Sequence, residues 1–194
     1  MVGHFEAPDT APTAIDLFAG CGGVTSGLLR SGIDVRRGYE LDDMARATYH
    51  KHHCEPNDTA LFGDATDVDP TLQGDIDIVF AGPPCQHFSQ CQGETVTDSE
   101  RNQLPFAVVD WVEAIEPSVC VVENVEGMRE SHSMTVDTLQ DAFRDAGYRT
   151  RLLSLNAKQY GVPQSRDRVF IMAIRETEDS NTTIPAQWKP PVYC

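Results

Sequence analysis

The thiol of Cys85 is the side chain in this sequence best placed to do chemistry. It lies in AGPPCQHFSQCQG, residues 81–93, directly after two prolines and six residues before Cys91. The prolines restrict the backbone of the loop that holds the thiol. A cysteine in such a segment can pack as a small apolar group, pair with a second cysteine in a disulfide or metal site, or act as a nucleophile. The segment alone leaves all three uses open.

Two later segments, VVENV and QSRDR, contain charged side chains that could act beside Cys85. Glu123 is expected at the end of the strand next to the one that precedes Cys85. Arg166 and Arg168 are two residues apart, so in an extended segment they point to the same side. They could supply the positive charge that a reactive thiolate or a bound anion needs.

A glycine-rich turn, DLFAGCGG, follows the first expected strand and opens a helix. Its three glycines, Gly20, Gly22 and Gly23, permit a tight turn, and the helix N-terminus can hold a negative group. The pattern is not the dinucleotide fingerprint. Acidic residues then follow the next two strands: Glu40 could accept from ribose hydroxyls and Asp64 from an adenine amino group. Together they favour an adenosine-containing cofactor over a plain glycine turn.

The elements that must position these residues alternate along the chain. Short apolar runs predict seven strands and amphipathic stretches predict four helices between them, which indicates an α/β, doubly wound sheet. Ligands bind such sheets at the carboxyl ends of the strands, where these polar residues gather. The expected strands are 14–18, 34–40, 60–65, 75–82, 119–125, 149–157 and 168–175, and the expected helices are 24–32, 42–53, 103–115 and 134–146.

The composition fits one globular domain in a chain of 194 residues. No apolar run is long enough to span a membrane, and the N-terminus has no signal-peptide pattern. Six cysteines in this context predict free thiols. The net charge of −15 makes the chain a poor general binder of nucleic acid; it indicates either a surface adapted to high salt or a basic partner.

Taken in order, these segments resemble the DNA (cytosine-5) methyltransferase family. The resemblance rests on DLFAGCGG, GYELD, GDATDVDP, AGPPCQHFS, SERNQL, VVENVEGM and LNAKQYGVPQSRDRVFIMAIR. It covers a catalytic domain over residues 14–176, between a polar lead-in (1–13) and an unpatterned tail (177–194). It implies the Rossmann-like, seven-stranded fold of S-adenosylmethionine-dependent methyltransferases.

The resemblance also implies a mechanism. A cytosine flipped out of double-stranded DNA is attacked at C6 by Cys85, while Glu123 binds the ring and Arg168 binds the cytosine carbonyl. C5 then takes the methyl group of S-adenosylmethionine. No metal is implied. Residues expected to position the substrate are Pro84, Gln86, Asn124, Gln164 and Arg166; those expected to bind the cofactor are Phe18, Ala19, Gly20, Gly22, Gly23, Glu40, Leu41, Asp64, Ala65 and Pro83.

Members of this family normally continue with a target-recognition domain and a last conserved block, neither of which is present here. We therefore expect a truncated or split enzyme, with a second polypeptide that recognises DNA. The alternatives are a non-catalytic module or remnant with this fold, and an RNA cytosine-5 methyltransferase. The family further implies DNA methylation, either in restriction–modification or in regulation, and a cytoplasmic, nucleoid-associated location.

Several other residues have simpler interpretations. The segment HKHHC, residues 50–54, suggests zinc, but a solvated helix end is the favoured reading. Cys91 is expected to be incidental and Cys120 to be a core residue, while Cys21 could line the cofactor site or fill a buried space. Trp111 has ordinary core spacing on its helix.

Overall fold

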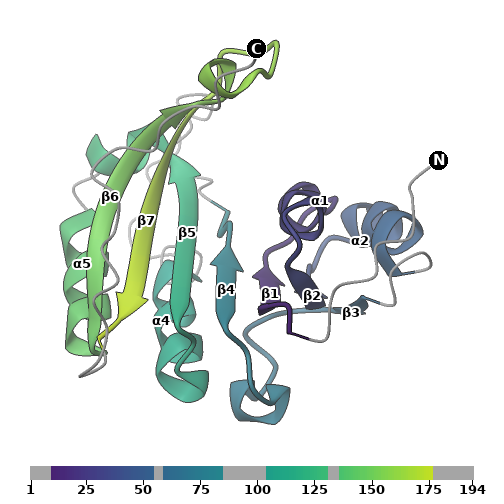
Figure 1. Ribbon diagram of the computed structural model, residues 1–194, viewed down its shortest axis with the longest axis horizontal. Coiled ribbons are helices and arrows are strands. Elements are labelled where there is room, and N and C mark those ends of the chain that lie inside the picture. Colours follow the sequence, from purple (N-terminus) through teal and green to yellow (C-terminus); the bar gives the residue numbers. More distant parts are fainter. Residues whose placement is uncertain (1–9, 55–58, 85–103, 131–135, 177–194) are drawn as a thin grey trace.

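The computed structural model describes residues 10–54, 59–84, 104–130 and 136–176, and these form one twisted seven-stranded sheet (Figure 1). The strand order is β3-β2-β1-β4-β5-β7-β6, in which β7 runs antiparallel to both of its neighbours and the other pairs are parallel. The predicted α/β fold with seven strands is therefore confirmed. The strands are β1 (Thr13–Leu17), β2 (Asp34–Tyr39), β3 (Ala60–Phe62), β4 (Ile78–Ala81), β5 (Val119–Val125), β6 (Tyr148–Asn156) and β7 (Asp167–Arg175).

Helices cover both faces of this sheet. Neighbouring residues of β1 belong to different apolar clusters: Ala14 packs with Leu29 of α1, whereas Ile15 belongs to the cluster that includes residues of α4 and α5. Because successive side chains of a strand point to opposite faces, α1 lies on one face and α4 and α5 on the other. The helices are α1 (Gly23–Arg30), α2 (Asp43–Tyr49), α4 (Leu104–Ile115) and α5 (Val136–Asp145), with shorter turns η1 (His50–Cys54), η2 (Pro70–Gln73), η4 (Glu126–Glu130) and η5 (Ala157–Tyr160).

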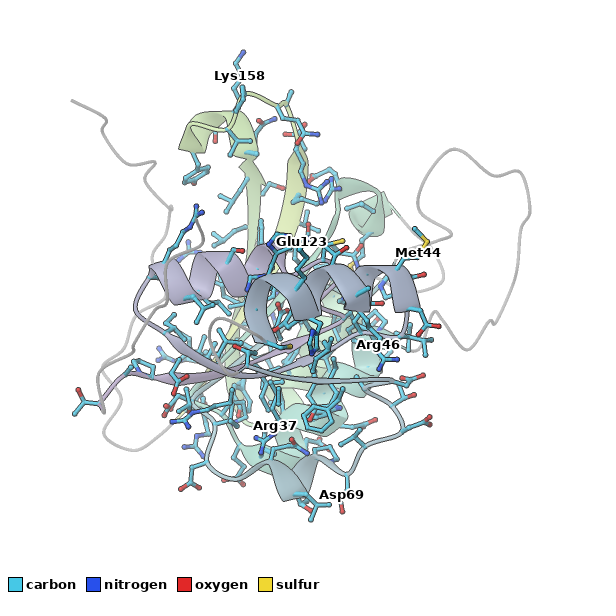
Figure 2. All side chains as sticks on the ribbon, turned by 90° about the vertical axis from the view of Figure 1, so that its right-hand side faces the viewer. Arg37, Met44, Arg46, Asp69, Glu123 and Lys158 are labelled. Carbon is cyan, nitrogen blue, oxygen red and sulfur yellow. The ribbon has the colours of Figure 1, made fainter. Side chains whose placement is uncertain are left out.

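The last two strands form a long hairpin that rises beyond the rest of the sheet (Figure 1). Residues 157–166 connect them without a crossover helix, which only an antiparallel pair allows. Lys158 lies at the outer tip of this hairpin, and Met44 projects from α2 (Figure 2). Within β7, Arg168 is paired with Val125 of β5, so the hairpin brings the arginine-containing end of β7 beside the end of β5.

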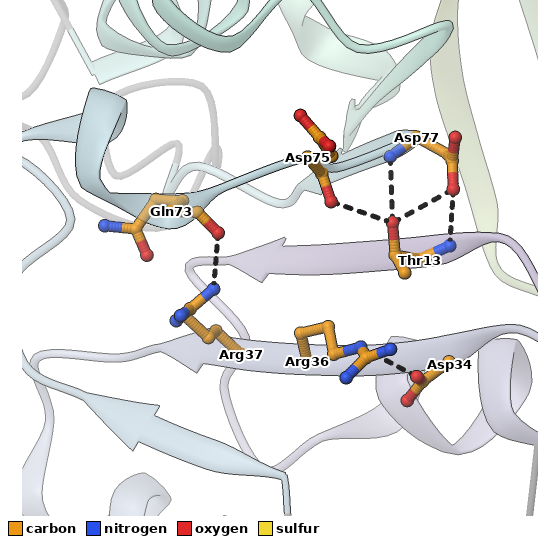
Figure 3. A network of polar contacts seen from close by, with 7 residues as sticks. All are labelled: Thr13, Asp34, Arg36, Arg37, Gln73, Asp75 and Asp77. Carbon is orange, nitrogen blue, oxygen red and sulfur yellow. Dashed lines mark hydrogen bonds and ion pairs between the residues drawn. The ribbon is translucent and has the colours of Figure 1, made fainter. Parts of the chain in front are cut away.

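The strand β2 is one residue shorter than predicted, and two other strands are shorter by three residues or more. The strand β3 ends at Phe62, so Asp64 and Ala65 lie in the turn after it. The strand β4 begins at Ile78 rather than at residue 75. Asp77 is instead held by its side chain, which accepts from the backbone nitrogen of Thr13 (2.8 Å) and from its hydroxyl (3.0 Å) (Figure 3).

Figure 3 shows these hydrogen bonds between Thr13 and Asp77 together with two further contacts at the same end of the sheet. Arg37 donates to the backbone oxygen of Gln73 (2.9 Å), and Arg36 forms an ion pair with Asp34 (2.7 Å). Thr13, which bonds to Asp77, is the first residue of β1, one position earlier than predicted. The bonds between Thr13 and Asp77 lie at the amino ends of β1 and β4, and Asp34 begins β2, so these contacts fix the sheet at the end opposite the expected site.

Candidate functional site

A pocket of about 1130 Å³ lies at the carboxyl ends of the first four strands. The segments that line it follow β1, β2, β3 and β4, and α4 closes one side. Five of its described side chains are carboxylates, and none is a lysine or arginine. The lining residues are Phe18, Tyr39, Glu40, Leu41, Asp42, Asp43, Met44, Gly63, Asp64, Ala65, Thr66, Gly82, Pro84, Leu104, Phe106, Ala107 and Asp110.

The backbone at Phe18 is held in a conformation that residues other than glycine rarely adopt. Its φ is 58°, in the left-handed region. The next residue, Ala19, donates its backbone N–H to the carbonyl oxygen of Tyr39 (2.9 Å), which ties the end of β1 to the end of β2. Strain of this kind is concentrated at functional sites, and here it places a half-buried aromatic ring in the pocket wall.

The carboxylate of Glu40 is fixed by two backbone bonds. Oε2 accepts from the nitrogen of Gly20 (2.8 Å), and Oε1 accepts from the nitrogen of Asp42 (2.8 Å). An ionised carboxylate has about four acceptor sites, so each oxygen can still accept one more bond. Two free acceptors on a rigid carboxylate match the paired hydroxyls of a ribose.

The turn after β3 presents a second ordered carboxylate. Asp64 accepts from both the backbone nitrogen and the hydroxyl of Thr66 (2.8 Å each), and both bonds use Oδ1. Its other oxygen is available to an amino group. With Phe18 and Glu40, this carboxylate gives the pocket an aromatic ring and acceptors for the hydroxyl and amino groups of adenosine. The acidic lining also suits the cationic sulfonium of S-adenosylmethionine, so the residues present fit that cofactor.

The glycine turn is built around one position that tolerates no side chain. Gly22 has a φ of 85°, and a Cβ atom there would lie 2.3 Å from two ring atoms of His53. That ring is only 3% exposed, and burial lowers the pKa of His53. The favoured interpretation of HKHHC as a solvated helix end is therefore wrong for His53, although His50 and His52 are exposed.

Beneath this turn, Asp16 caps the first helix from inside the protein. Its Oδ2 accepts from the nitrogen (3.1 Å) and the hydroxyl (2.7 Å) of Thr25, and the hydroxyls of Thr25 and Tyr49 lie 2.9 Å apart. Burial raises the pKa of Asp16 to about 7, against the two bonds from Thr25, which lower it. The α1 N-terminus is thereby joined to β1 and to α2.

A second set of charged residues lies beside the pocket. Glu123 accepts from Nε of Arg168 (2.9 Å), and a terminal nitrogen of Arg166 lies 3.7 Å from the same carboxylate oxygen. The predicted common direction of the two arginines is confirmed. A Cβ atom placed on Gly82 would lie 3.8 Å from both Oε2 of Glu123 and the backbone oxygen of Phe18. Since Gly82 and Phe18 line the pocket, the two sets of residues meet there.

Asn124 lies beside Glu123 and is 3% exposed. Its Oδ1 accepts from the nitrogen of Val125 (2.7 Å), whereas its buried Nδ2 has no partner among the residues that the structure describes. The expectation that Asn124 helps to position the substrate stays a prediction, and Cys85, Gln86 and Cys91 lie outside the described residues.

Of the other residues expected in the site, some line the pocket and others do not. Leu41 lines the pocket and is 68% exposed, and Pro84, expected to position the substrate, also lines it. Pro83 is buried and, like Ala19, Gly20, Gly22 and Gly23, is not among the residues that line this pocket. Gln164 is exposed in the β6–β7 connection. Cys120 is fully buried, as predicted. Cys21 is exposed, so of its two alternative roles that of a buried filler is wrong.

Sequence reasoning missed several of the residues that form this site. Tyr39, Met44, Thr66 and Asp110 line the pocket, and Trp111 supports it from below. Tyr39 directly precedes Glu40 and Thr66 directly follows Ala65. Their position next to predicted cofactor-binding residues was therefore a signal that could have identified them.

The described ranges contain neither a metal-binding cluster nor a membrane-spanning helix. No group of three or more His, Cys, Asp or Glu side chains in them could hold a metal ion. No helix in the same ranges has the length and apolar character needed to cross a membrane.

Comparison with known proteins gives a consistent result. The profile described as C-5 cytosine-specific DNA methylase matches residues 13–192. The chain is 35% identical over 178 residues to the type II methyltransferase M.DdeI of Desulfomicrobium norvegicum, covering 88% of this chain and 42% of that protein. It is 32% identical over 173 residues to M.NgoPII of Neisseria gonorrhoeae, covering 88% and 50%. The chain thus spans half or less of the length of these relatives.

Solved structures show the same fold. A prophage-encoded protein of E. coli, described as a DNA modification methyltransferase, is 26% identical with a TM-score of 0.71, covering 85% of this chain and 47% of that one. A mutant of DNMT2 from Spodoptera frugiperda is 19% identical with a TM-score of 0.72, covering 94% and 55%. The second likeness concerns the fold alone.

Proposed function

The chain belongs to the C-5 cytosine-specific DNA methylase family, and from this premise we propose that it provides the catalytic part of an enzyme that methylates C5 of cytosine in DNA. One observation carries the proposal. The pocket that fits S-adenosylmethionine and the Glu123–Arg168 pair adjoin at Gly82, so a methyl donor and a cytosine could be held side by side. This function would place the protein on nucleoid DNA.

The cofactor is S-adenosylmethionine, which supplies an electrophilic methyl group on its sulfonium when bound. Phe18 would pack on the adenine, Glu40 would accept from the ribose hydroxyls, and Asp64 would accept from the adenine amino group. All three lie in the wall of one pocket. The carboxylates of Glu40 and Asp64 are held by backbone N–H groups of the chain, so the ligand would meet acceptors that are already oriented.

The chemistry on the base requires a nucleophile because C5 of cytosine is unreactive by itself. The Cys85 thiolate would add to C6 of the flipped base, forming an S–C6 bond and moving an electron pair toward N3. Glu123, in its protonated form, would donate a hydrogen bond or its proton to N3, and Arg168 would bind the carbonyl oxygen. C5 would then take the methyl group, with S-adenosylhomocysteine as the leaving product. A water molecule acting as base would remove the C5 proton, which re-forms the C5–C6 double bond, expels the thiolate and lets N3 return its proton to Glu123.

Recognition of a DNA site is assigned to polypeptide outside these 194 residues, either in the same chain or in a second one. Two observations support this. The relatives are about twice as long as the part matched here, and a chain with a net charge of −15 has few cations to neutralise phosphates.

The experiment is transfer of labelled methyl groups to DNA by the chain, alone and together with the products of neighbouring genes. We expect transfer in at least one of these conditions, and Cys85→Ala should abolish it, whereas Cys91→Ala should preserve it. Glu123→Gln should lower the rate by about 100-fold or more, the usual range for a group that transfers a proton. Glu113→Gln, an exposed position on α4, is the matched control.

Trapping on DNA that contains 5-fluorocytosine provides a second readout. Because the fluorine cannot leave as a cation, the adduct with Cys85 persists after methyl transfer. Absence of both methyl transfer and trapping would support a non-catalytic module and contradict the proposal. Transfer to RNA with none to DNA would instead assign the RNA substrate.

A further inference from the structure

The indole of Trp111 lies directly beneath the turn that forms the adenine end of the pocket. Trp111 is on α4 and is 3% exposed, and its Nε1 donates to the backbone oxygen of Ala65 (3.0 Å). Ala65 lines the pocket and is itself 4% exposed. A core tryptophan therefore makes its one polar bond to the wall of the candidate cofactor site.

The oxygen of Ala65 and the nitrogen of Thr66 belong to the same peptide unit, which is planar. The indole holds the carbonyl edge of this unit. Its N–H edge donates to Oδ1 of Asp64 (2.8 Å). Fixing the carbonyl therefore fixes the direction of the N–H, and that N–H in turn orients the Asp64 carboxylate.

The aromatic neighbours of Trp111 restrict its ring. The ring of Tyr39 meets it edge-on, with centroids 5.0 Å apart, and Tyr39 also stacks on Phe62 at 5.3 Å. The hydroxyl of Tyr39 donates to Oε1 of Gln73 (2.7 Å), which anchors it to η2. The indole N–H is thus directed at Ala65 by packing against Tyr39, which is itself held by Phe62 and Gln73.

We propose that Trp111 is a positioning residue for the adenine end of the pocket: its N–H holds the Ala65–Thr66 peptide so that Asp64 accepts from the 6-amino group of adenine. This inference rests on the proposed function, which places S-adenosylmethionine in the pocket. It adds to that function a residue of this chain that touches neither the cofactor nor the substrate.

The test compares two ligands by isothermal titration calorimetry. One is S-adenosylhomocysteine, and the other is the same compound with its adenine replaced by unsubstituted purine, which lacks the 6-amino group. Trp111→Phe should raise the Kd of S-adenosylhomocysteine by about tenfold, which corresponds to about 1.4 kcal/mol. It should change the Kd of the purine analogue by less than about twofold, because that ligand has no amino group for Asp64 to bind.

A merely structural role would give a different pattern, because a loosened core weakens both ligands alike. Equal loss for the two ligands would overturn the inference. Should Trp111→Phe fail to fold, replacing Trp111 with benzothienylalanine keeps the size of the ring and removes only the N–H, and the same pattern is expected.

Two further variants sharpen the test. Tyr148→Phe removes another buried bond to a backbone oxygen, that of Pro117 (2.7 Å), just beyond the far end of α4. It should lower the free energy of unfolding by loss of that bond without changing either Kd. In an Asp64→Ala background, Trp111→Phe should have no further effect on S-adenosylhomocysteine, and an undiminished effect would refute the route through Asp64. If the wild-type chain bound neither ligand, the cofactor assignment of the proposed function would fail first, and the inference with it.

Discussion

The glycine turn gives the most quantitative prediction, the effect of Gly22→Ala on stability. The backbone at Gly22 has a φ of 85°, where an alanine is disfavoured by about 1–2 kcal/mol. The new Cβ would lie 2.3 Å from the buried ring of His53 and 3.0 Å from Tyr49. Relief of that overlap requires the ring or the turn to move, which typically costs about 1–3 kcal/mol in a packed interior. We expect a total loss of about 2–5 kcal/mol in the free energy of unfolding.

The two contributions can be separated with a double-mutant cycle measured by urea unfolding. In a His53→Ala background the overlap with the ring is removed, so Gly22→Ala should cost only about 1–2 kcal/mol. Gly27→Ala is the matched control, because Gly27 lies in α1 with nothing within 4 Å of its Cβ position; it should be neutral or stabilise by up to about 1 kcal/mol. An equal cost of Gly22→Ala in both backgrounds would refute the contact between Gly22 and His53.

Two more predictions concern stability. Burial raises the pKa of Asp16 to about 7, so the folded state binds this proton more tightly than the unfolded state does. The protonated acid therefore contributes stability that is full below about pH 4 and is lost as the pH rises to about 7. The stability of Asp16→Asn relative to wild type should therefore increase from pH 4 to 7, by up to a few kcal/mol, and a difference that is flat over this range in chemical unfolding would contradict the buried acid. Asp77→Ala removes two bonds to Thr13 and should lower the unfolding free energy by about 1–2 kcal/mol without changing cofactor affinity, which calorimetry can check; a weakened affinity would show that this end of the sheet is coupled to the pocket.

The main features of the site could be predicted because parallel strands place their carboxyl ends together. Glu40, Asp64 and Glu123 each follow or end an apolar run, and the structure brings two of them into one pocket and the third beside it. The common direction of Arg166 and Arg168 followed from their i, i+2 spacing in an extended segment, whereas the ion pair of Arg168 with Glu123 was not predicted. These predictions needed only the period of a strand and the direction of the chain.

Other features depend on contacts that no local pattern contains. His53 is buried because Gly22, more than thirty residues earlier, leaves room for its ring. The spacing of Trp111 indicates a core residue, but the direction of its N–H is set by Tyr39 and by the turn at Ala65. The antiparallel direction of β7 was not predicted, although the connection of residues 157–166, which has no long helix, was a usable signal.

Equilibrium binding of methyl-labelled S-adenosylmethionine to the purified chain tests the central claim most directly. We predict saturable binding of one molecule per chain, competed by S-adenosylhomocysteine, lost in Glu40→Ala and retained in the exposed control Glu113→Ala. Binding that did not saturate, or that was unchanged in Glu40→Ala, would contradict the assignment of this pocket to the methyl donor.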